Sequence, residues 1–288
     1  MNKTEKKFAG LAVRIRTALV LLPLVLLPIY WGGAAFVALL IIAAIFMAYE
    51  WTALLQSGHK NRDGFCLSFL LIAHLLVAAM TTPQNALALL LVSLCFGAGL
   101  ACVGGVRMTP MMGGLLYIGW PLLAAFYLYV MAGELASIVI FYVLISVWAV
   151  DIFAMFGGKF IGGAKLAPRL SPSKTWAGLL GAVAGAAGVA VASHMVFMAS
   201  PHFALTQANV NKMLVLAVSI ALVAQFGDLF ESYLKRKYNR KDSGNLMPGH
   251  GGILDRVDGL IAVLVFLHIL VLINGTTPID ALFFVGGR

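Results

Sequence analysis

Charged residues and cysteines are both scarce in this sequence. Charged side chains make up 11% of the 288 residues, against about 25% in an ordinary soluble domain. The three cysteines, Cys66, Cys95 and Cys102, lie in apolar segments, with no CxxC pair and no histidine spaced for zinc. The sequence also has no internal repeat and no low-complexity segment. A disulfide scaffold, a cysteine-based zinc site and a repeat protein are therefore excluded.

Apolar residues, in contrast, are abundant. They make up 61% of the chain, and the mean hydropathy is +0.97. These values exclude a soluble nucleic-acid-binding protein and indicate an all-α polytopic membrane protein. The formal net charge of +9 then indicates cytoplasmic loops and anionic partners, such as lipid headgroups or phosphorylated substrates.

Hydropathy predicts a bundle of about nine transmembrane helices. The apolar segment 18–55 would be about 57 Å long as one helix and would exceed a hydrocarbon core of about 30 Å. It must fold back, and Gly32-Gly33 is the expected turn. The count becomes eight if this hairpin enters the membrane without crossing it. The predicted helices are 18–31, 34–55, 65–80, 86–106, 113–132, 136–156, 176–198, 210–230 and 259–274.

Basic residues predict the orientation of this bundle. With the N-terminus in the cytoplasm, all but two of the 20 Lys and Arg residues fall on the cytoplasmic side, the exceptions being Lys212 and Arg288. This distribution follows the positive-inside rule. The expected organisation is a set of N-terminal transmembrane helices in residues 1–135 and a transmembrane catalytic region in residues 136–288, with cytoplasmic loops at 157–175 and 232–256.

Two pairs of acidic residues interrupt the apolar pattern. Asp228 and Glu231 are three positions apart, as are Asp255 and Asp258, so each pair shares a helical face. The first pair lies near a helix C-terminus, where the macrodipole disfavours carboxylates. A positive partner is expected there, either from residues 235–236 or from a metal ion, and an all-oxygen ligand set suits Mg²⁺. Solvation at the membrane interface and N-terminal capping by Asp258 remain open as simpler explanations.

Basic and glycine-rich segments accompany these acids. Residues 235–242 are strongly basic and precede the glycine-rich turn 248–252. Such a basic run also serves as a topology anchor, but glycines let backbone amides approach anionic oxygens closely. A second anion site is expected where Ser171, Lys174 and Thr175 lead into a helix. Its spacing is not that of a Walker loop.

The longest motif extends over 27 positions, from Ser232 to Asp258. It reads SYLKR, four residues, KDSG, two residues, then MPGHGGILDRVD. This pattern resembles the signature of the phosphatidate cytidylyltransferase (CDP-diacylglycerol synthase) family. Met247 stands where that family has Ile, Leu or Phe, an apolar exchange without chemical consequence. Further similarity extends to residues 166–176, to Gly227-Asp228-Leu229 with Glu231, to Trp148 with Asp151, and to Glu50-Trp51.

The resemblance implies transfer of a cytidylyl group from CTP to phosphatidate, which yields CDP-diacylglycerol and pyrophosphate and requires Mg²⁺. The lipid phosphate is already an anionic nucleophile, so the reaction needs no Ser-His or Cys-His pair, and the sequence shows none. The expected catalytic residues are Asp228, Lys235, Arg236, Asp255 and His250, the last either contacting pyrophosphate or holding the glycine-rich turn. The expected metal ligands are Asp228, Glu231, Asp255 and Asp258, with Asp151 as a further candidate. The expected substrate-binding residues are Ser171, Lys174, Thr175, Lys241 and Arg256.

Three other classes of membrane protein share parts of this pattern. A CDP-alcohol phosphotransferase is excluded, because Val263 breaks its DGxxAR motif. A CTP-dependent polyprenol kinase remains open. An ion-coupled transporter also remains open. A transporter would have broken helices in both halves of the chain, whereas the charges here are concentrated in one half.

The expected partners are CTP, phosphatidate and the lipid bilayer, without nucleic acid. A homodimer is left open, and the expected location is a bacterial inner membrane with the site facing the cytoplasm.

Overall fold

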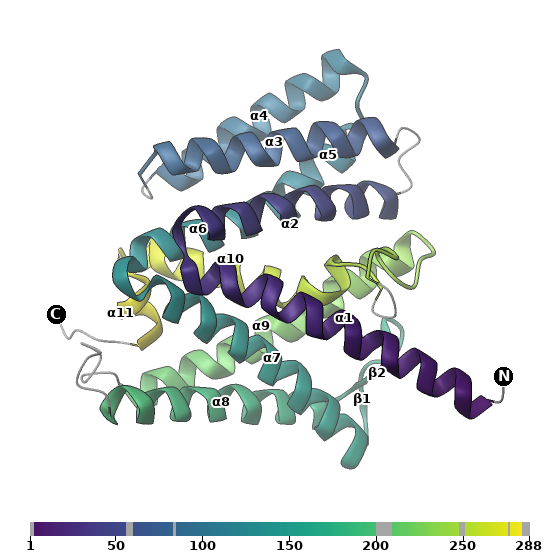
Figure 1. The fold of residues 1–288 in the computed structure, drawn as a ribbon, viewed down its shortest axis with the longest axis vertical. Coiled ribbons are helices and arrows are strands. Elements are labelled where there is room, and N and C mark those ends of the chain that lie inside the picture. Colours follow the sequence, from purple (N-terminus) through teal and green to yellow (C-terminus); the bar gives the residue numbers. More distant parts are fainter. Residues whose placement is uncertain are drawn as a thin grey trace. The chain divides into compact units, whose positions relative to one another are not determined.

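The computed structural model describes residues 3–55, 60–82, 85–199, 209–247, 251–275 and 277–283. Helices form most of it (Figure 1), as the all-α prediction requires. The helical elements are α1 (Lys3–Trp31), α2 (Gly33–Leu54), α3 (Lys60–Met80), α4 (Ala86–Gly104), α5 (Met108–Gly114), the π-helix η2 (Leu115–Gly119), α6 (Trp120–Ala132), the 3₁₀-helix η3 (Gly133–Leu135), α7 (Ala136–Phe160), α8 (Trp176–Ala199), α9 (Val210–Lys237), α10 (Leu254–Asn274) and α11 (Pro278–Phe283).

A glycine turn separates the first two helices. α1 ends at Trp31 and α2 begins at Gly33. Gly32 and Gly33 have φ angles of 67° and 52°, in the left-handed region that glycine adopts without steric cost. The predicted turn at Gly32-Gly33 is therefore confirmed.

Each predicted apolar segment corresponds to a helix or helical run, but α1 begins at Lys3, 15 residues before the predicted start, and α9 ends at Lys237, seven residues after the predicted end. Within the described ranges, six helical runs are long and apolar enough to cross a membrane, and two further apolar helices, Arg16–Trp31 and Ala86–Cys102, are shorter. One of the six, Met108–Phe160, contains two of the predicted segments. Gly133, with a φ of 57°, lies between them in η3. The chain is therefore an integral membrane protein built from helices.

Both predicted cytoplasmic loops contain more regular structure than expected. α9 continues to Lys237 and α10 begins at Leu254, so the predicted loop 232–256 shortens to residues 238–253. The segment 157–175 contains the end of α7 and an antiparallel hairpin, made of β1 (Lys165–Ala167) and β2 (Ser171–Thr175). Hydropathy missed these elements because they are short or polar.

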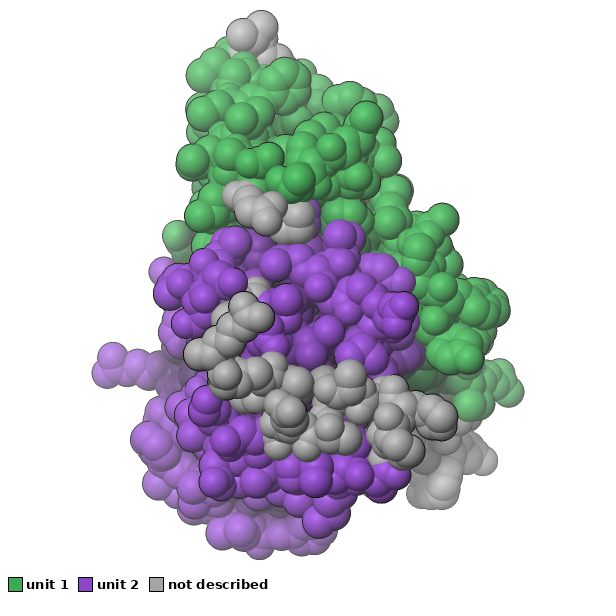
Figure 2. Space-filling view, turned by 90° about the vertical axis from the view of Figure 1, so that its left-hand side faces the viewer, with its two compact units in different colours: residues 1–126, 235–257 green, residues 127–234, 258–288 purple. Residues whose placement is uncertain are grey.

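The chain forms two compact units, which Figure 2 shows in different colours. Unit 1 comprises residues 1–126 and 235–257, and unit 2 comprises residues 127–234 and 258–288. α9 and α10 each contribute to both units. The core of unit 1 consists of large side chains from α2, α3, α5 and η2 that are less than 2% exposed, including Leu54, Leu67, Leu71, Met111, Leu115 and Ile118.

In unit 2, α7 and α8 pack with their backbones in close approach. A Cβ added to Gly157 would lie 2.5 Å from the carbonyl oxygen of Ala177, and one added to Gly185 would lie 2.7 Å from that of Ala149. Small residues at such positions let transmembrane helices pack tightly. The β1–β2 hairpin connects the two helices, so their packing holds the hairpin at one end of the pair.

Candidate active site

Lys235 and Asp255 form an ion pair in unit 1. Lys235 lies in the last turn of α9 and Asp255 in the first turn of α10. The Lys235 Nζ atom donates a hydrogen bond of 2.6 Å to Asp255 Oδ1, and the two side chains are only 13% and 9% exposed. A carboxylate in the first turn and an ammonium in the last turn both complement the helix macrodipoles.

The other carboxylate oxygen of Asp255 binds the loop that joins the two helices. Asp255 Oδ2 accepts hydrogen bonds from Ser243 N (2.9 Å), Ser243 Oγ (2.9 Å) and Gly252 N (3.0 Å). A carboxylate oxygen has about two lone-pair sites, so donors of the protein saturate Oδ2, while Oδ1 accepts from Lys235. This arrangement supports a role of Asp255 in holding Lys235. Its role as a metal ligand stays a prediction.

Glu50 on α2 is a third member of this group, and it is not among the site residues predicted from the sequence. Glu50 Oε1 accepts a hydrogen bond from Ile253 N, and Oε2 accepts one from Leu254 N, each of 2.9 Å. These amides begin α10, where N–H groups have no partner within the helix. Glu50 is only 6% exposed. A carboxylate inside an apolar helix was the signal that could have identified it.

Glycines of the long motif let these carboxylates approach the loop. A Cβ added to Gly244 would lie 2.8 Å from Glu50 Oε1, and one added to Gly252 would lie 2.6 Å from Glu50 Oε2. Gly251 has a φ of 82° and faces Asp255. Phosphate binding was predicted for the amides of the turn 248–252, of which residues 248–250 lie outside the described residues. The amide of Gly252, and those of Ile253 and Leu254 that follow the turn, bind carboxylates of the protein itself.

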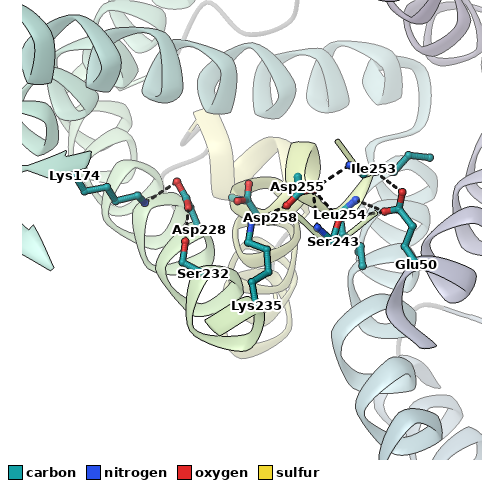
Figure 3. A network of polar contacts seen from close by, with 12 residues as sticks. Glu50, Lys174, Asp228, Ser232, Lys235, Ser243, Ile253, Leu254, Asp255 and Asp258 are labelled. Atoms are coloured by element: carbon teal, nitrogen blue, oxygen red, sulfur yellow. Dashed lines mark hydrogen bonds and ion pairs between the residues drawn. The ribbon is translucent and has the colours of Figure 1, made fainter. Parts of the chain in front are cut away.

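A second ion pair, between Lys174 and Asp228, lies in unit 2. Lys174 is on β2 and Asp228 is on α9, and their Nζ and Oδ2 atoms are 2.7 Å apart. Lys174 also donates a hydrogen bond to the carbonyl oxygen of Gln225 (3.3 Å), and Ser232 Oγ donates one to Asp228 Oδ1 (3.4 Å). The Asp228 side chain remains 34% exposed. Figure 3 shows this ion pair and the unit 1 network.

Asp258 lies beside a close crossing of α9 and α10 within unit 2. A Cβ added to Gly227 would lie 2.6 Å from the carbonyl oxygen of Asp258, and one added to Gly259 would lie 3.3 Å from that of Ala224. Asp228 follows Gly227 directly, so this crossing brings the Asp228 and Asp258 positions to one place. α10 begins at Leu254, so Asp258 lies in its second turn. The alternative that Asp258 is an N-terminal cap is therefore wrong.

The remaining predicted site residues have different environments. Thr175 is 4% exposed and accepts a hydrogen bond from Gly178 N (3.0 Å), which makes it the N-cap of α8. Ser171 Oγ lies 3.3 Å from Ser173 Oγ. Glu231 is fully buried on α9. The exposed residues are Asp151, Arg236, Lys241 and Arg256. His250 lies outside the described residues.

The donor set limits how a metal could bind. Among the described residues, no three His, Cys, Asp or Glu side chains come together as a metal site. Mg²⁺ usually needs only one or two carboxylates, because substrate phosphates and water complete its coordination. Asp228, whose side chain is 34% exposed, and Asp258 at the adjoining helix crossing suit that requirement better than Asp255, whose side chain is 9% exposed and accepts four hydrogen bonds.

These features define a helical membrane protein with two aspartate–lysine ion pairs, a combination suited to binding phosphates. A family model described as "Cytidylyltransferase family" matches residues 12–274, and the chain belongs to this family. It is 33% identical over 274 residues to a phosphatidate cytidylyltransferase of Rickettsia bellii (strain RML369-C), covering 94% of each chain. It is 36% identical over 275 residues to one of Brucella abortus biovar 1 (strain 9-941), covering 91% of this chain and 93% of the relative.

Proposed function

We propose that this protein transfers the cytidylyl group of CTP to phosphatidate, forming CDP-diacylglycerol and pyrophosphate. The observation that carries this proposal is the similarity to phosphatidate cytidylyltransferases over more than 90% of both chains. The local chemistry agrees with it. The ion pairs and the exposed basic residues 236, 240 and 241 offer several contacts for a triphosphate and a lipid phosphate.

The reaction needs positioning and charge neutralisation more than proton transfer. A phosphate oxygen of phosphatidate attacks the α-phosphorus of CTP, and the bond to the β-phosphate oxygen breaks to release pyrophosphate. Both reactants are anions, so the protein must overcome their mutual repulsion and align them. Lysine and arginine side chains at the ends of rigid helices supply fixed positive charge for this purpose.

Lys174 and Lys235 are held in place by ion pairs. Each is paired with an aspartate and is less than 15% exposed. In the proposal, they bind phosphate oxygens of the substrates, assisted by Arg236, Lys241 and Arg256. Asp255 and Thr175 act by placing these groups: Asp255 orients Lys235, and Thr175 caps α8 directly after Lys174. Ser171 contributes from the start of β2.

Mg²⁺ binding is assigned to Asp228 and Asp258 in this proposal, with phosphate oxygens of CTP as the remaining ligands. Bound there, the ion would supply positive charge to the reacting phosphates. Glu231 lies three residues after Asp228 and is fully buried, so its role would be to support Asp228. Asp151 is exposed near the end of α7 and is a candidate to support the same ion.

The proposed setting is a bacterial cytoplasmic membrane with the N-terminus inside. In this proposal the chain crosses the membrane nine times, with α1 and α2 counted separately, so that the hairpin and the 238–253 loop face the cytoplasm. CTP is available there, while the acyl chains of phosphatidate remain in the bilayer. The C-terminal region 136–288 would carry most of the substrate contacts.

The direct test uses the purified full-length protein in detergent with CTP, phosphatidate and Mg²⁺. The expected result is stoichiometric release of pyrophosphate with formation of CDP-diacylglycerol, detected by mass spectrometry. Formation of CDP and a phosphorylated lipid from polyprenol would instead identify a CTP-dependent polyprenol kinase. Solute flux in proteoliposomes, without turnover of CTP, would identify a transporter.

A further inference from the structure

The Glu50 carboxylate joins two parts of unit 1 that lie far apart in the sequence. It bonds to backbone amides 203 and 204 positions away, at the beginning of α10. We infer that Glu50 is a positioning residue for cytidylyl transfer: it fixes the first turn of α10 and so sets Asp255 and the Lys235 ammonium for phosphate binding. This inference rests on the proposed function.

The end of α2 that carries Glu50 is firmly held. Trp51 Nε1 donates a hydrogen bond of 2.9 Å to the carbonyl oxygen of Pro110, and the Trp51 ring stacks on Tyr117 with centroids 5.1 Å apart. A Cβ added to Gly113 would lie 2.8 Å from the Trp51 ring. The neighbouring residue Glu50 therefore projects from a rigid support, which a residue that sets the geometry of a site requires.

Ser243 lies between Glu50 and Asp255. Its hydroxyl lies 2.9 Å from Asp255 Oδ2 and 3.4 Å from Glu50 Oε2. A hydroxyl has one proton to donate, and the shorter distance assigns it to Asp255. Ser243 is 5% exposed, so water does not easily replace it. Ser243 therefore fixes Asp255, and with it Lys235 Nζ, directly beside the Glu50 carboxylate.

The loop is shaped for a carboxylate at this point. Gly244 and Gly252 both lie so close to Glu50 that a side chain at either position would displace the carboxylate. Both amides that Glu50 accepts from lie in the same short segment as Gly252. A residue that only filled space would need neither two aligned amide donors nor two glycines packed against its carboxylate.

Glu50→Gln is the first test, because it keeps the size of the side chain and removes one acceptor. Glutamine has one carbonyl oxygen, so either the Ile253 or the Leu254 amide would face an NH₂ group. The expected result is a fall in kcat of about 10- to 100-fold, since small displacements of positioned groups have effects of this size. KM for CTP should change by less than about threefold if ground-state binding is kept. Glu134→Gln, at an exposed carboxylate in η3, is the matched control and should retain wild-type kcat.

A double-mutant cycle distinguishes positioning from a general loss of stability. Ser243→Ala removes a hydroxyl that fixes Asp255. If Glu50 also acts by placing Asp255, both substitutions loosen the same carboxylate, and the double variant should have a kcat close to that of the slower single variant. Multiplicative effects of the two substitutions would overturn the inference, as would a Glu50→Gln variant with wild-type kcat.

Gly244→Ala gives an independent test if Glu50→Gln does not fold. It leaves the Glu50 side chain unchanged but displaces its carboxylate, and Gly99→Ala, where an added Cβ has no neighbour within 4 Å, is its control. Gly244→Ala should lower kcat at least tenfold and Gly99→Ala should not; equal kcat values would contradict the inference.

The wild-type protein is assayed first with CTP and phosphatidate. Absence of pyrophosphate release there would refute the proposed function, whereas an active wild type with unaffected variants would refute only the role of Glu50.

Discussion

Lys174 on the β2 strand pairs with Asp228 on α9, with 2.7 Å between Nζ and Oδ2. The pair connects a segment that hydropathy alone treats as a loop to the acidic part of a membrane helix. Lys174 also bonds to the carbonyl oxygen of Gln225, one turn earlier on α9. A lysine with two such contacts is held in one position, and its remaining donor hydrogen can meet a phosphate.

Lys174→Met should therefore lower kcat/KM by about 100-fold, the typical effect of removing one fixed positive group from a site that stabilises developing negative charge. Initial rates of pyrophosphate release at varied CTP and phosphatidate measure this effect. Lys212→Met, at an exposed lysine in the first turn of α9, serves as the matched control and should stay within about twofold of the wild type. Equal losses in both variants would show that only general charge matters.

Asp228→Asn and Asp258→Asn should each weaken Mg²⁺ binding, because a neutral amide is a poorer ligand for a hard cation than a carboxylate. We expect the Mg²⁺ concentration for half-maximal activity to rise at least tenfold. Electron paramagnetic resonance of Mn²⁺ with CTP present gives a readout independent of turnover, and fewer bound ions are expected in both variants. Unchanged Mn²⁺ binding would remove these residues from the metal site.

Asp255→Asn should behave differently, since the Asp255 side chain is 9% exposed and accepts four hydrogen bonds within the protein. The substitution removes the negative charge that pairs with the largely buried Lys235 ammonium, at a cost of about 3 kcal/mol in the free energy of unfolding. We expect a lower melting temperature in detergent and reduced turnover, with an unchanged Mg²⁺ requirement for the remaining activity. A large shift in that requirement, at wild-type thermal stability, would instead identify Asp255 as a ligand.

Hydropathy was sufficient to place the helices, because segments that lie in lipid must be apolar and helical. The Gly32-Gly33 turn was predictable for a related reason: one helix from residue 18 to 55 would exceed the bilayer thickness. The β1–β2 hairpin was not, since strands of three and five residues leave no recognisable periodicity.

The partners of the acidic residues could not be read from the sequence. Lys235 or Arg236, on the same helix, was the predicted partner of Asp228, but the observed partner is Lys174 from the hairpin. Lys235 instead pairs with Asp255, 20 positions away. Glu50 accepts a hydrogen bond from the first turn of α10, although the two lie more than 200 positions apart in the sequence. Such contacts depend on how helices pack, and spacing along one helix carries no information on that packing.

The close approach of α7 and α8 gives a prediction for stability. Gly181 on α8 faces the carbonyl group of Phe153, and an added Cβ would overlap it. Gly181→Ala should therefore push the two helices apart at a cost of about 1–3 kcal/mol, the usual penalty of overpacking. A lower melting temperature in detergent is the expected readout. Gly188→Ala on the same helix is the control, because an added Cβ there has no neighbour within 4 Å.

The control variant should be as stable as the wild type or gain up to about 1 kcal/mol, since alanine favours a helix over glycine. The two variants carry the same chemical change on one helix, so their difference isolates the contact with α7. Separation of the helices also shifts the β1–β2 hairpin that connects them, and with it Lys174. Gly181→Ala should then lose activity even below its melting temperature, and wild-type turnover in that variant would show that the hairpin holds its position without this packing.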